Sequence, residues 1–166
     1  VQWDGETSGE LQCAGSWIAS TYYNDSRAGE SFTDDGWLRT GDVATMDSSG
    51  RIRLVDRTKD LIKTGGEWIS SVEIENELMS HPKIKEAAVV GVPHPKWSER
   101  PLACVVLNPG ELLTKQEVLD YVRPRLAKWQ VPDDVVFIDE VPKTSVGKFS
   151  KKTLREKYAD YVLPNI

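Results

Sequence analysis

The chain has 166 residues, of which 39% are hydrophobic and 28% are charged, a balance that is ordinary for a globular protein and argues against global disorder. Its net charge of −5 and isoelectric point near 5.1 argue against a surface that binds nucleic acid throughout. The charge is uneven: residues 1–55 carry nine acidic and four basic side chains, whereas residues 143–157 carry six basic and one acidic.

Two cysteines, Cys13 and Cys104, lie far apart and match no metal-ligand spacing, so no disulfide framework and no metal site are predicted, and a reducing cytosol is the default environment. The longest apolar run, AAVVGVP at 87–93, is too short to cross a bilayer. The polar opening VQWDGETSGELQ lacks Met and any leader pattern, so we expect a piece of a larger protein.

The first third of the chain has the pattern of short strands separated by turn residues. GELQCAG, SWIAS and WLRTGDVATMD are the predicted strands, and DSSG at 47–50 is a turn that joins VATM to RIRLVD as a hairpin. The charged segment DRTKD follows at 56–60. In LIKTGGEWIS, Gly65 and Gly66 permit a tight turn between two further short strands.

Helix signals appear only after residue 69. Ser70 with Glu73 and Thr114 with Glu117 are spaced as capping boxes, the second opening a helix through about Leu126 with distortion from Pro124. A last helix is predicted in SKKTLREKYADYV at 150–162.

Between these helices, IKEAAVVGVPH and RPLACVVLNPG are predicted to pair as a buried hairpin, and VPDDVVFIDEVP adds a strand. The expected fold class is α+β: a small C-terminal domain of mixed short sheets with about three helices, preceded by a β subdomain.

Several motifs admit both a structural and a chemical interpretation. Asp42, after Gly41 in WLRTGD, could accept hydrogen bonds from the vicinal hydroxyls of a ribose or satisfy a turn. Residues 56–60 could be a solvated linker, or a hinge in which Arg57 holds a sugar or phosphate. Gly65 and Gly66 could serve only the turn, or let a ligand pass close to the backbone.

The basic segment KTSVGKFSKK at 143–152 also admits two interpretations. It could be a phosphate-binding face, although no aromatic stacking pattern accompanies it. Alternatively, Lys148 could project one ammonium into an active site from a loop, while Lys151 and Lys152 at a helix start, and Lys143 beside a proline, are solvated surface charges.

Taken in order, GEL, WLRTGD, GRIRLVDRTKDLIKTGGEWISSVEIE and PKTSVGKFSKKTLR resemble the C-terminal part of the AMP-forming acyl-CoA synthetases, a branch of the adenylate-forming ligase superfamily. The resemblance covers essentially the whole chain. Residues 65–106 look most like the medium- or long-chain fatty-acid–CoA ligases. The resemblance implies that residues 1–55 end a large N-terminal domain, 56–60 are a hinge, and 61–166 are a mobile C-terminal domain.

The resemblance also implies a role for particular positions. Asp42, Arg57 and Lys148 would bind ATP or AMP, and Lys148 would be catalytic, bridging an acyl carboxylate and the α-phosphate during adenylation. Lys59 would be the pivot, with Asp56 as its competitor. Lys63, Gly65, Gly66 and Glu67 would line the pantetheine path of CoA. Trp68 stands where some relatives have an Arg, so no contacts to the CoA nucleotide are assigned.

The implied enzyme activates a fatty acid with ATP and transfers it to CoA, and the chain alone is expected to be inactive. Mg²⁺ is expected with ATP, held by residues outside this chain. No nucleic-acid partner and no transmembrane segment are expected, and the expected location is cytoplasmic, with association of the full-length enzyme at a membrane surface left open. Two alternative functions remain. One is an adenylating enzyme that passes its acyl-adenylate to a carrier-protein thiol or to an oxidation step, and the other is a non-catalytic binding module.

Overall fold

The computed structural model describes residues 1–26 and 28–164. These form two compact units, Val1–Lys59 and Asp60–Ile166, and each is described by itself. Within the described residues, no helix is both long enough and apolar enough to span a membrane.

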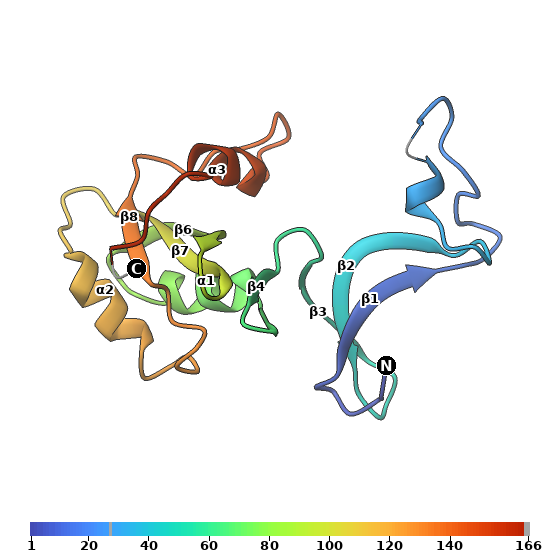
Figure 1. Ribbon diagram of the computed structural model, residues 1–166, viewed down its shortest axis with the longest axis horizontal. Coiled ribbons are helices and arrows are strands. Elements are labelled where there is room, and N and C mark those ends of the chain that lie inside the picture. The colour runs from blue at the N-terminus through green and yellow to red at the C-terminus, as the bar shows by residue number, and fades with distance from the viewer. Residues whose placement is uncertain (27, 165–166) are drawn as a thin grey trace. The chain divides into compact units, whose positions relative to one another are not determined.

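The first unit is built on an antiparallel sheet in the order β1 (Ser8–Cys13), β2 (Leu38–Met46) and β3 (Ile52–Arg57), with a short 3-10 helix, η1 (Ala28–Ser31), between β1 and β2 (Figure 1). The predicted hairpin is confirmed. Gly50 N–H donates to the Asp47 carbonyl at 2.9 Å, and the Asp47 carboxylate accepts from the N–H of Ser49 at 2.9 Å. An Asx turn therefore sets the β2–β3 register.

The prediction of a strand at SWIAS is wrong. The Ile18 N–H donates to the Gly15 carbonyl at 3.0 Å, and Gly15 has a φ of 153°. The chain therefore turns here, and its local hydrogen bond replaces a sheet ladder.

Large apolar side chains remain exposed on this unit. Trp17 and Tyr23 are 98% and 99% exposed, and Ile52 and Leu54 on β3 are also exposed. These side chains therefore do not contribute to a core of the first unit.

The second unit contains a sheet in the order β5 (Glu67–Ile69), β4 (Ile62–Thr64), β7 (Ser98–Leu107) and β6 (Ile84–His94), and β8 (Asp134–Phe137) pairs with β7 in parallel. The long β6–β7 hairpin was predicted from its continuous apolar runs, and the structure confirms it from Ile84 opposite Leu107 to His94 opposite Ser98. The Gly65–Gly66 turn between β4 and β5 is confirmed as well.

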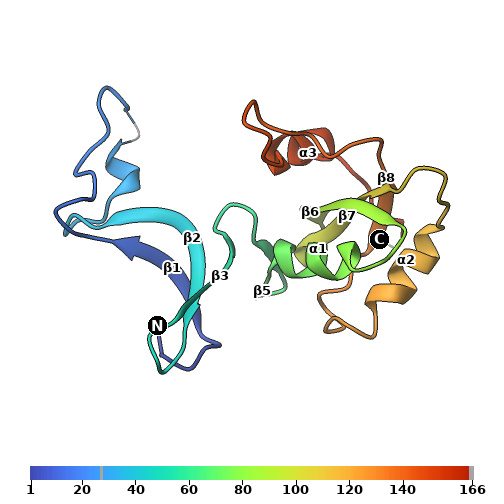
Figure 2. The same cartoon turned by 180° about the vertical axis from the view of Figure 1, so that it is seen from behind.

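Three helices cover this sheet, as expected: α1 (Ser71–Met79), α2 (Lys115–Val122) and α3 (Lys151–Lys157) (Figure 2). Ala87 and Val89 point to one face, where they pack with Ile74 of α1 and Val118 of α2. The alternate residues of β6 pack with Leu154 of α3 on the other face. Full burial of a side chain such as Leu154 contributes roughly 1.5–3 kcal/mol.

The helix ends differ in part from the predictions. The Thr114–Glu117 capping box is complete, with Thr114 Oγ1 and Glu117 each accepting from the other's backbone N–H. At α1 only half of the box forms, because the carboxylate of Glu73 binds the side-chain amide of Gln130 instead. The second helix ends at Val122 rather than near Leu126, because Pro124 has no N–H to donate.

Candidate functional site

The first group of predicted residues meets where β2 and β3 pair. Asp42 lies opposite Arg57, and the Arg57 Nε forms an ion pair with the Asp42 carboxylate at 3.1 Å. Gly41 has a φ of 72°, and a Cβ there would lie 4.0 Å from the guanidinium. The Asp42 side chain keeps 33% of its surface exposed. Its carboxylate is therefore oriented by Arg57 and still has acceptor positions open to solvent.

The residues at the end of β3 and just beyond it differ in how firmly their backbone is held. Asp56 is buried within the ladder opposite Val43, and its carboxylate accepts from the Arg57 N–H at 2.7 Å. Thr58 N–H donates to the Gly41 carbonyl at 2.9 Å. Lys59 lies beyond these bonds, is exposed, and borders a hollow also lined by Gly41 and Arg57. The boundary between the two units follows it directly.

The two glycines of the β4–β5 turn have different surroundings. The Gly65 N–H donates to the Trp97 carbonyl at 3.0 Å, and a Cβ on Gly65 would lie 2.7 Å from Cε3 of that indole. A Cβ on Gly66 would meet nothing within 4 Å. Gly65 is therefore required by packing, whereas Gly66 borders open space. The two side chains before and after the turn, Lys63 and Glu67, are exposed.

Lys63 and Trp68 face each other across the β4–β5 pair, and the Lys63 ammonium lies 4.9 Å from the centre of the indole ring. The Lys63 backbone N–H donates to the Glu99 carboxylate at 2.9 Å. Trp68 therefore holds a cation in place at this edge, although it cannot itself supply the positive charge of an arginine.

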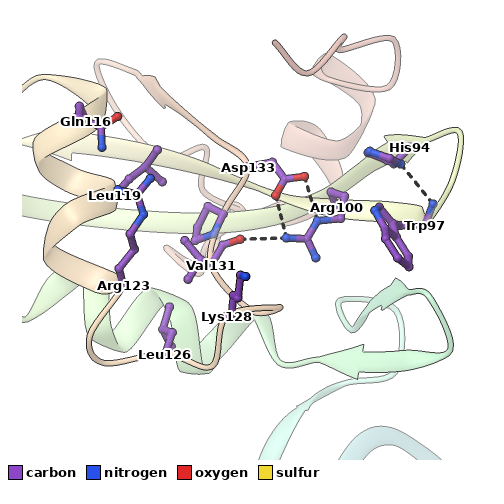
Figure 3. A pocket seen from close by; sticks show the side chains of 11 residues that line it. His94, Trp97, Arg100, Gln116, Leu119, Arg123, Leu126, Lys128, Val131 and Asp133 are labelled. Carbon is purple, nitrogen blue, oxygen red and sulfur yellow. Dashed lines mark hydrogen bonds and ion pairs between the residues drawn. The ribbon is translucent and has the colours of Figure 1, made fainter. Parts of the chain in front are cut away.

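Arg100 of β7 was missed by the sequence analysis, yet it holds this region together (Figure 3). Its Nε and Nη2 bind both carboxylate oxygens of Asp133, at 2.9 and 2.7 Å. Nη1 donates to Thr64 Oγ1 at 3.2 Å and to the Trp129 carbonyl at 2.7 Å, and Nη2 also donates to the Val131 carbonyl at 3.1 Å. All five guanidinium donors are used, so Arg100 joins β4 to the segment that precedes β8.

A hollow of about 470 Å³ opens beside the glycine turn. It is lined by Thr64, Gly65, Glu67, Trp97, Arg100, Lys128, Trp129 and Asp133. The turn after β6 fixes Trp97, because the His94 Nδ1 accepts from the backbone N–H of Lys96 and of Trp97, at 3.1 and 3.2 Å (Figure 3). Lys128 is exposed and has no carboxylate partner among residues 1–26 and 28–164. The hollow thus offers two indoles and one cation, Lys128, that has no carboxylate partner within the described part of the chain.

Lys148 lies on a small hairpin between β8 and α3. Thr144 N–H donates to the Lys148 carbonyl at 2.7 Å, and the Lys148 N–H donates back to Thr144 Oγ1 at 3.2 Å. Gly147 occupies the turn with a φ of 80°. The Lys148 side chain is exposed and makes no ion pair within the part of the chain that the structure describes.

The other lysines of this segment are paired. Lys143 Nζ lies 2.9 Å from Glu86, Lys152 Nζ lies 3.8 Å from Glu156, and Lys151 Nζ lies 2.8 Å from Glu75. The expectation that Lys151 is a solvated charge is wrong, because its side chain is only 11% exposed. Nothing in its local sequence separates it from Lys152, since the carboxylate it binds lies on α1.

Two pKa shifts describe the surroundings of these groups. The hydrogen bond from Lys143 lowers the pKa of Glu86, which keeps that pair ionised. Burial raises the pKa of the Cys104 thiol to about 12. Cys104 is therefore a packing residue and not a nucleophile.

Among the described residues, no cluster of His, Cys, Asp and Glu could hold a metal ion. The proposed reaction therefore assigns no Mg²⁺ ligand among these residues.

The fold of the second unit is that of the C-terminal domain of adenylate-forming enzymes. Residues 73–148 match the family described as the AMP-binding enzyme C-terminal domain. The solved structure of ATP-bound MatB from Rhodopseudomonas palustris is 34% identical, has a TM-score of 0.86, and is matched over 93% of this chain and 31% of its own. The chain therefore belongs to the AMP-binding, adenylate-forming enzyme family.

Three curated relatives give a closer comparison. A long-chain-fatty-acid–CoA ligase of Thermus thermophilus is 54% identical over 95% of this chain and 29% of its own length. A 3-methylmercaptopropionyl-CoA ligase of Ruegeria pomeroyi is 49% identical over 95% of this chain and 29% of its own length. A medium-chain-fatty-acid–CoA ligase of Ectopseudomonas oleovorans is 46% identical over 96% and 29%, respectively. The chain thus spans less than a third of the length of these relatives.

Proposed function

We propose that this chain is the C-terminal part of a fatty-acid:CoA ligase. In the first half-reaction the carboxylate attacks the α-phosphate of ATP, giving acyl-AMP and pyrophosphate. In the second the CoA thiol attacks the acyl carbon, giving the thioester and AMP, with the thiol proton released. The observation that carries this proposal is Lys148, the one lysine of its segment, within the described residues, whose ammonium is not bound to a carboxylate.

Lys148 supplies what the first half-reaction needs. Two anions, a carboxylate and a phosphate, must approach, and negative charge builds up as they react. A preorganised ammonium that has no other partner stabilises that charge, by an amount comparable to one oxyanion-hole donor, about 2.7–4 kcal/mol. Lys143 and Lys151 cannot do the same without breaking their own ion pairs.

Asp42 and Arg57 are proposed to hold the nucleotide. The Asp42 carboxylate would accept hydrogen bonds from the ribose hydroxyls, while its pairing with Arg57 at 3.1 Å keeps it oriented. The half-exposed guanidinium of Arg57 would bind the same ribose or a phosphate.

For the second half-reaction we assign the β4–β5 turn to the pantetheine arm of CoA. A Cβ on Gly66 would meet no other atom within 4 Å, so there is open space beside this residue. Lys63 and Glu67 lie on either side of the turn. The adjoining hollow, with Trp97, Trp129 and Lys128, has surfaces suited to an aromatic ring and to phosphate. Gly65 also lines this hollow, and the Trp97 indole fills only the side of Gly65 where a Cβ would lie, so both glycines belong to the proposed path.

We propose the domain boundaries 1–55, 56–60 and 61–166, with residues 56–60 as the hinge and Lys59 as its pivot. A pivot must change φ and ψ without losing ladder hydrogen bonds. Asp56 is buried in the β2–β3 ladder, whereas Lys59 lies outside it. This favours Lys59 over Asp56.

ATP and CoA are substrates in this proposal, and Mg²⁺ would accompany ATP on residues outside this chain. We also propose a cytosolic location, with the full-length enzyme able to associate with a membrane surface. The support is the pair of free cysteines, Cys13 and Cys104, and cell fractionation of the full-length enzyme tests the location.

The test is Lys148→Ala in the full-length enzyme, measured by ATP–pyrophosphate exchange with a fatty acid. We expect a loss of about 100-fold or more, the size seen for one oxyanion-hole donor. Lys152→Ala is the matched control, because it removes an exposed lysine four positions away and should leave exchange unchanged. Unchanged exchange in Lys148→Ala would reject the assignment. Thioester formation with CoA, compared with a carrier-protein thiol, identifies the acceptor.

A further inference from the structure

The hairpin that carries Lys148 is attached at both ends by ion pairs to other parts of its unit. On the N-terminal side of Lys148, Lys143 binds Glu86 of β6. On its C-terminal side, Lys151 binds Glu75 of α1. We propose that Lys151 and Glu75 are positioning residues that hold Lys148 at the place where adenylation needs it. This inference rests on the adenylation role proposed above for Lys148.

The two arms of the hairpin are bonded to each other, so the position of its ends affects the position of Lys148. The Ser150 N–H donates to the Pro142 carbonyl at 2.7 Å, and the backbones of Lys143 and Phe149 form an isolated antiparallel β-bridge between the two arms. Only two residues separate Lys148 from Lys151, a span of about 10 Å when extended. A displacement of Lys151 therefore moves the arm of the hairpin that carries Lys148.

The anchor at Lys151 is a buried network, unlike an ordinary surface salt bridge. The Lys151 and Glu75 side chains are 11% and 8% exposed, and their charged atoms are 2.8 Å apart. Lys151 Nζ also donates to Ser71 Oγ at 2.7 Å, and Glu75 accepts from the Val89 N–H at 2.7 Å. The network thus connects α3 to α1 and to β6.

The sequence around the start of α3 does not explain why Lys151 occupies its first position. The first turn of α3 contains no acidic residue, and its N-cap, Ser150, makes no side-chain cap hydrogen bond. A cation in the first turn is disfavoured by the helix dipole. A buried pair is also often no more stabilising than apolar side chains of the same size. What the pair supplies is a defined position for Lys151, which fits a role in placing the loop.

The second attachment of α3 keeps the helix from moving as a whole. Arg155 is paired with Asp60, the first residue of the second unit, and Leu154 is buried against the sheet. By contrast, Lys143 in the Lys143–Glu86 pair is 43% exposed. Exposed pairs constrain little, so of the two ion pairs at the ends of the hairpin, Lys151–Glu75 is the stronger restraint.

The experiment compares Lys151→Met and Lys152→Met in the full-length enzyme. Both remove one ammonium from adjacent positions, but only Lys151 has a buried partner. Three quantities are measured: ATP–pyrophosphate exchange, thioester formation from preformed acyl-adenylate, and hydrogen exchange of the Gly147 and Lys148 amides. A misplacement of about 1 Å costs up to about 100-fold in rate.

We expect Lys151→Met to lower kcat for adenylation by about 10-fold to 100-fold, to leave the thioester step within about twofold, and to speed exchange of both amides. Lys152→Met should match the wild type in all three. Lys151→Arg, which keeps the charge and can reach Glu75, should recover most of the adenylation rate. If Lys151→Met does not fold, Glu75→Gln weakens the same pair while keeping an acceptor for the Val89 N–H, and should show the same selectivity with a smaller loss.

The outcomes separate the two proposals. If Lys148→Ala removes adenylation but Lys151→Met changes neither adenylation nor amide exchange, only the positioning proposal fails. An equal loss of both half-reactions in Lys151→Met also overturns it, because that pattern indicates general damage to the domain. If Lys148→Ala leaves adenylation intact, the role of Lys148 fails, and the positioning proposal fails with it.

Discussion

Gly65 and Trp97 are in direct contact. The Gly65 N–H donates to the Trp97 carbonyl at 3.0 Å, and the indole fills the space where a Gly65 side chain would begin. Gly66, the next residue, also has a positive φ but has no neighbour at its Cβ position. Substitutions at Gly65 and Gly66 therefore distinguish the cost of backbone strain from the cost of steric contact with Trp97.

We predict that Gly65→Ala destabilises the protein by about 1–3 kcal/mol more than Gly66→Ala does. Both substitutions place a Cβ at positive φ, so both carry that strain, but only the first overlaps an indole that must then move. The free energy of unfolding by urea measures the difference. Equal losses would show that Trp97 moves aside freely.

A second prediction concerns the chemistry at Gly66. Gly66→Leu fills the open space beside the β4–β5 turn. Thioester formation from preformed acyl-adenylate should fall by about 100-fold, on the scale of a misplaced reacting group. ATP–pyrophosphate exchange should change less than about threefold, because our proposal assigns this turn to the thioester step only. Gly66→Ala is the control for backbone strain alone. An equal fall in both half-reactions of Gly66→Leu would reject a pantetheine path here.

Arg100→Lys is predicted to destabilise the second unit by about 2–4 kcal/mol. The compact ammonium cannot replace the five donors that bind Asp133, Thr64 and the carbonyls of the 129–131 segment. Chemical denaturation gives the loss, and Arg39→Lys is the control, because Arg39 is half-exposed and binds a single carboxylate. Comparable effects of the two substitutions would contradict the structural role of Arg100.

The buried carboxylate of Asp134 predicts a dependence of stability on pH. Burial opposes its ionisation, but hydrogen bonds from Tyr161, Lys115 and the Val135 N–H outweigh burial and lower the pKa of Asp134 below its ordinary value of 3.8. The unfolded state binds the proton more tightly, so this contribution to folding is complete above that value and is lost as pH falls further.

Unfolding free energies of wild type and Asp134→Asn should therefore differ most above pH about 5 and converge as pH falls below 3.8. Tyr161 reports on the same bond, because burial and the Asp134 carboxylate raise its pKa to about 12. In Asp134→Asn the Tyr161 ionisation should move back toward 10.0, measured by absorbance. A difference between the proteins that is constant with pH would contradict this account.

Features that depend on local sequence were predictable. The Thr114–Glu117 capping box and the DSSG turn act within a few residues, and the apolar β6–β7 runs are consecutive strands joined by a short turn; the structure confirms all three. SWIAS failed because a local hydrogen bond at Gly15 competes with strand pairing. The order of the motifs was enough to place the chain in its family, and the family match agrees.

What required the tertiary structure was the state of individual charges. Lys148, Lys151 and Lys152 look alike in sequence, because composition and spacing describe a lysine but not its partner. The fold brings Glu75 of α1 to Lys151, Asp133 to Arg100 and Trp97 to Gly65 across 76, 33 and 32 positions, respectively. Sequence alone therefore determined the family, most of the secondary structure and the candidate residues. Long-range packing decided which cation is buried, which is left unpaired, and which glycine faces open space.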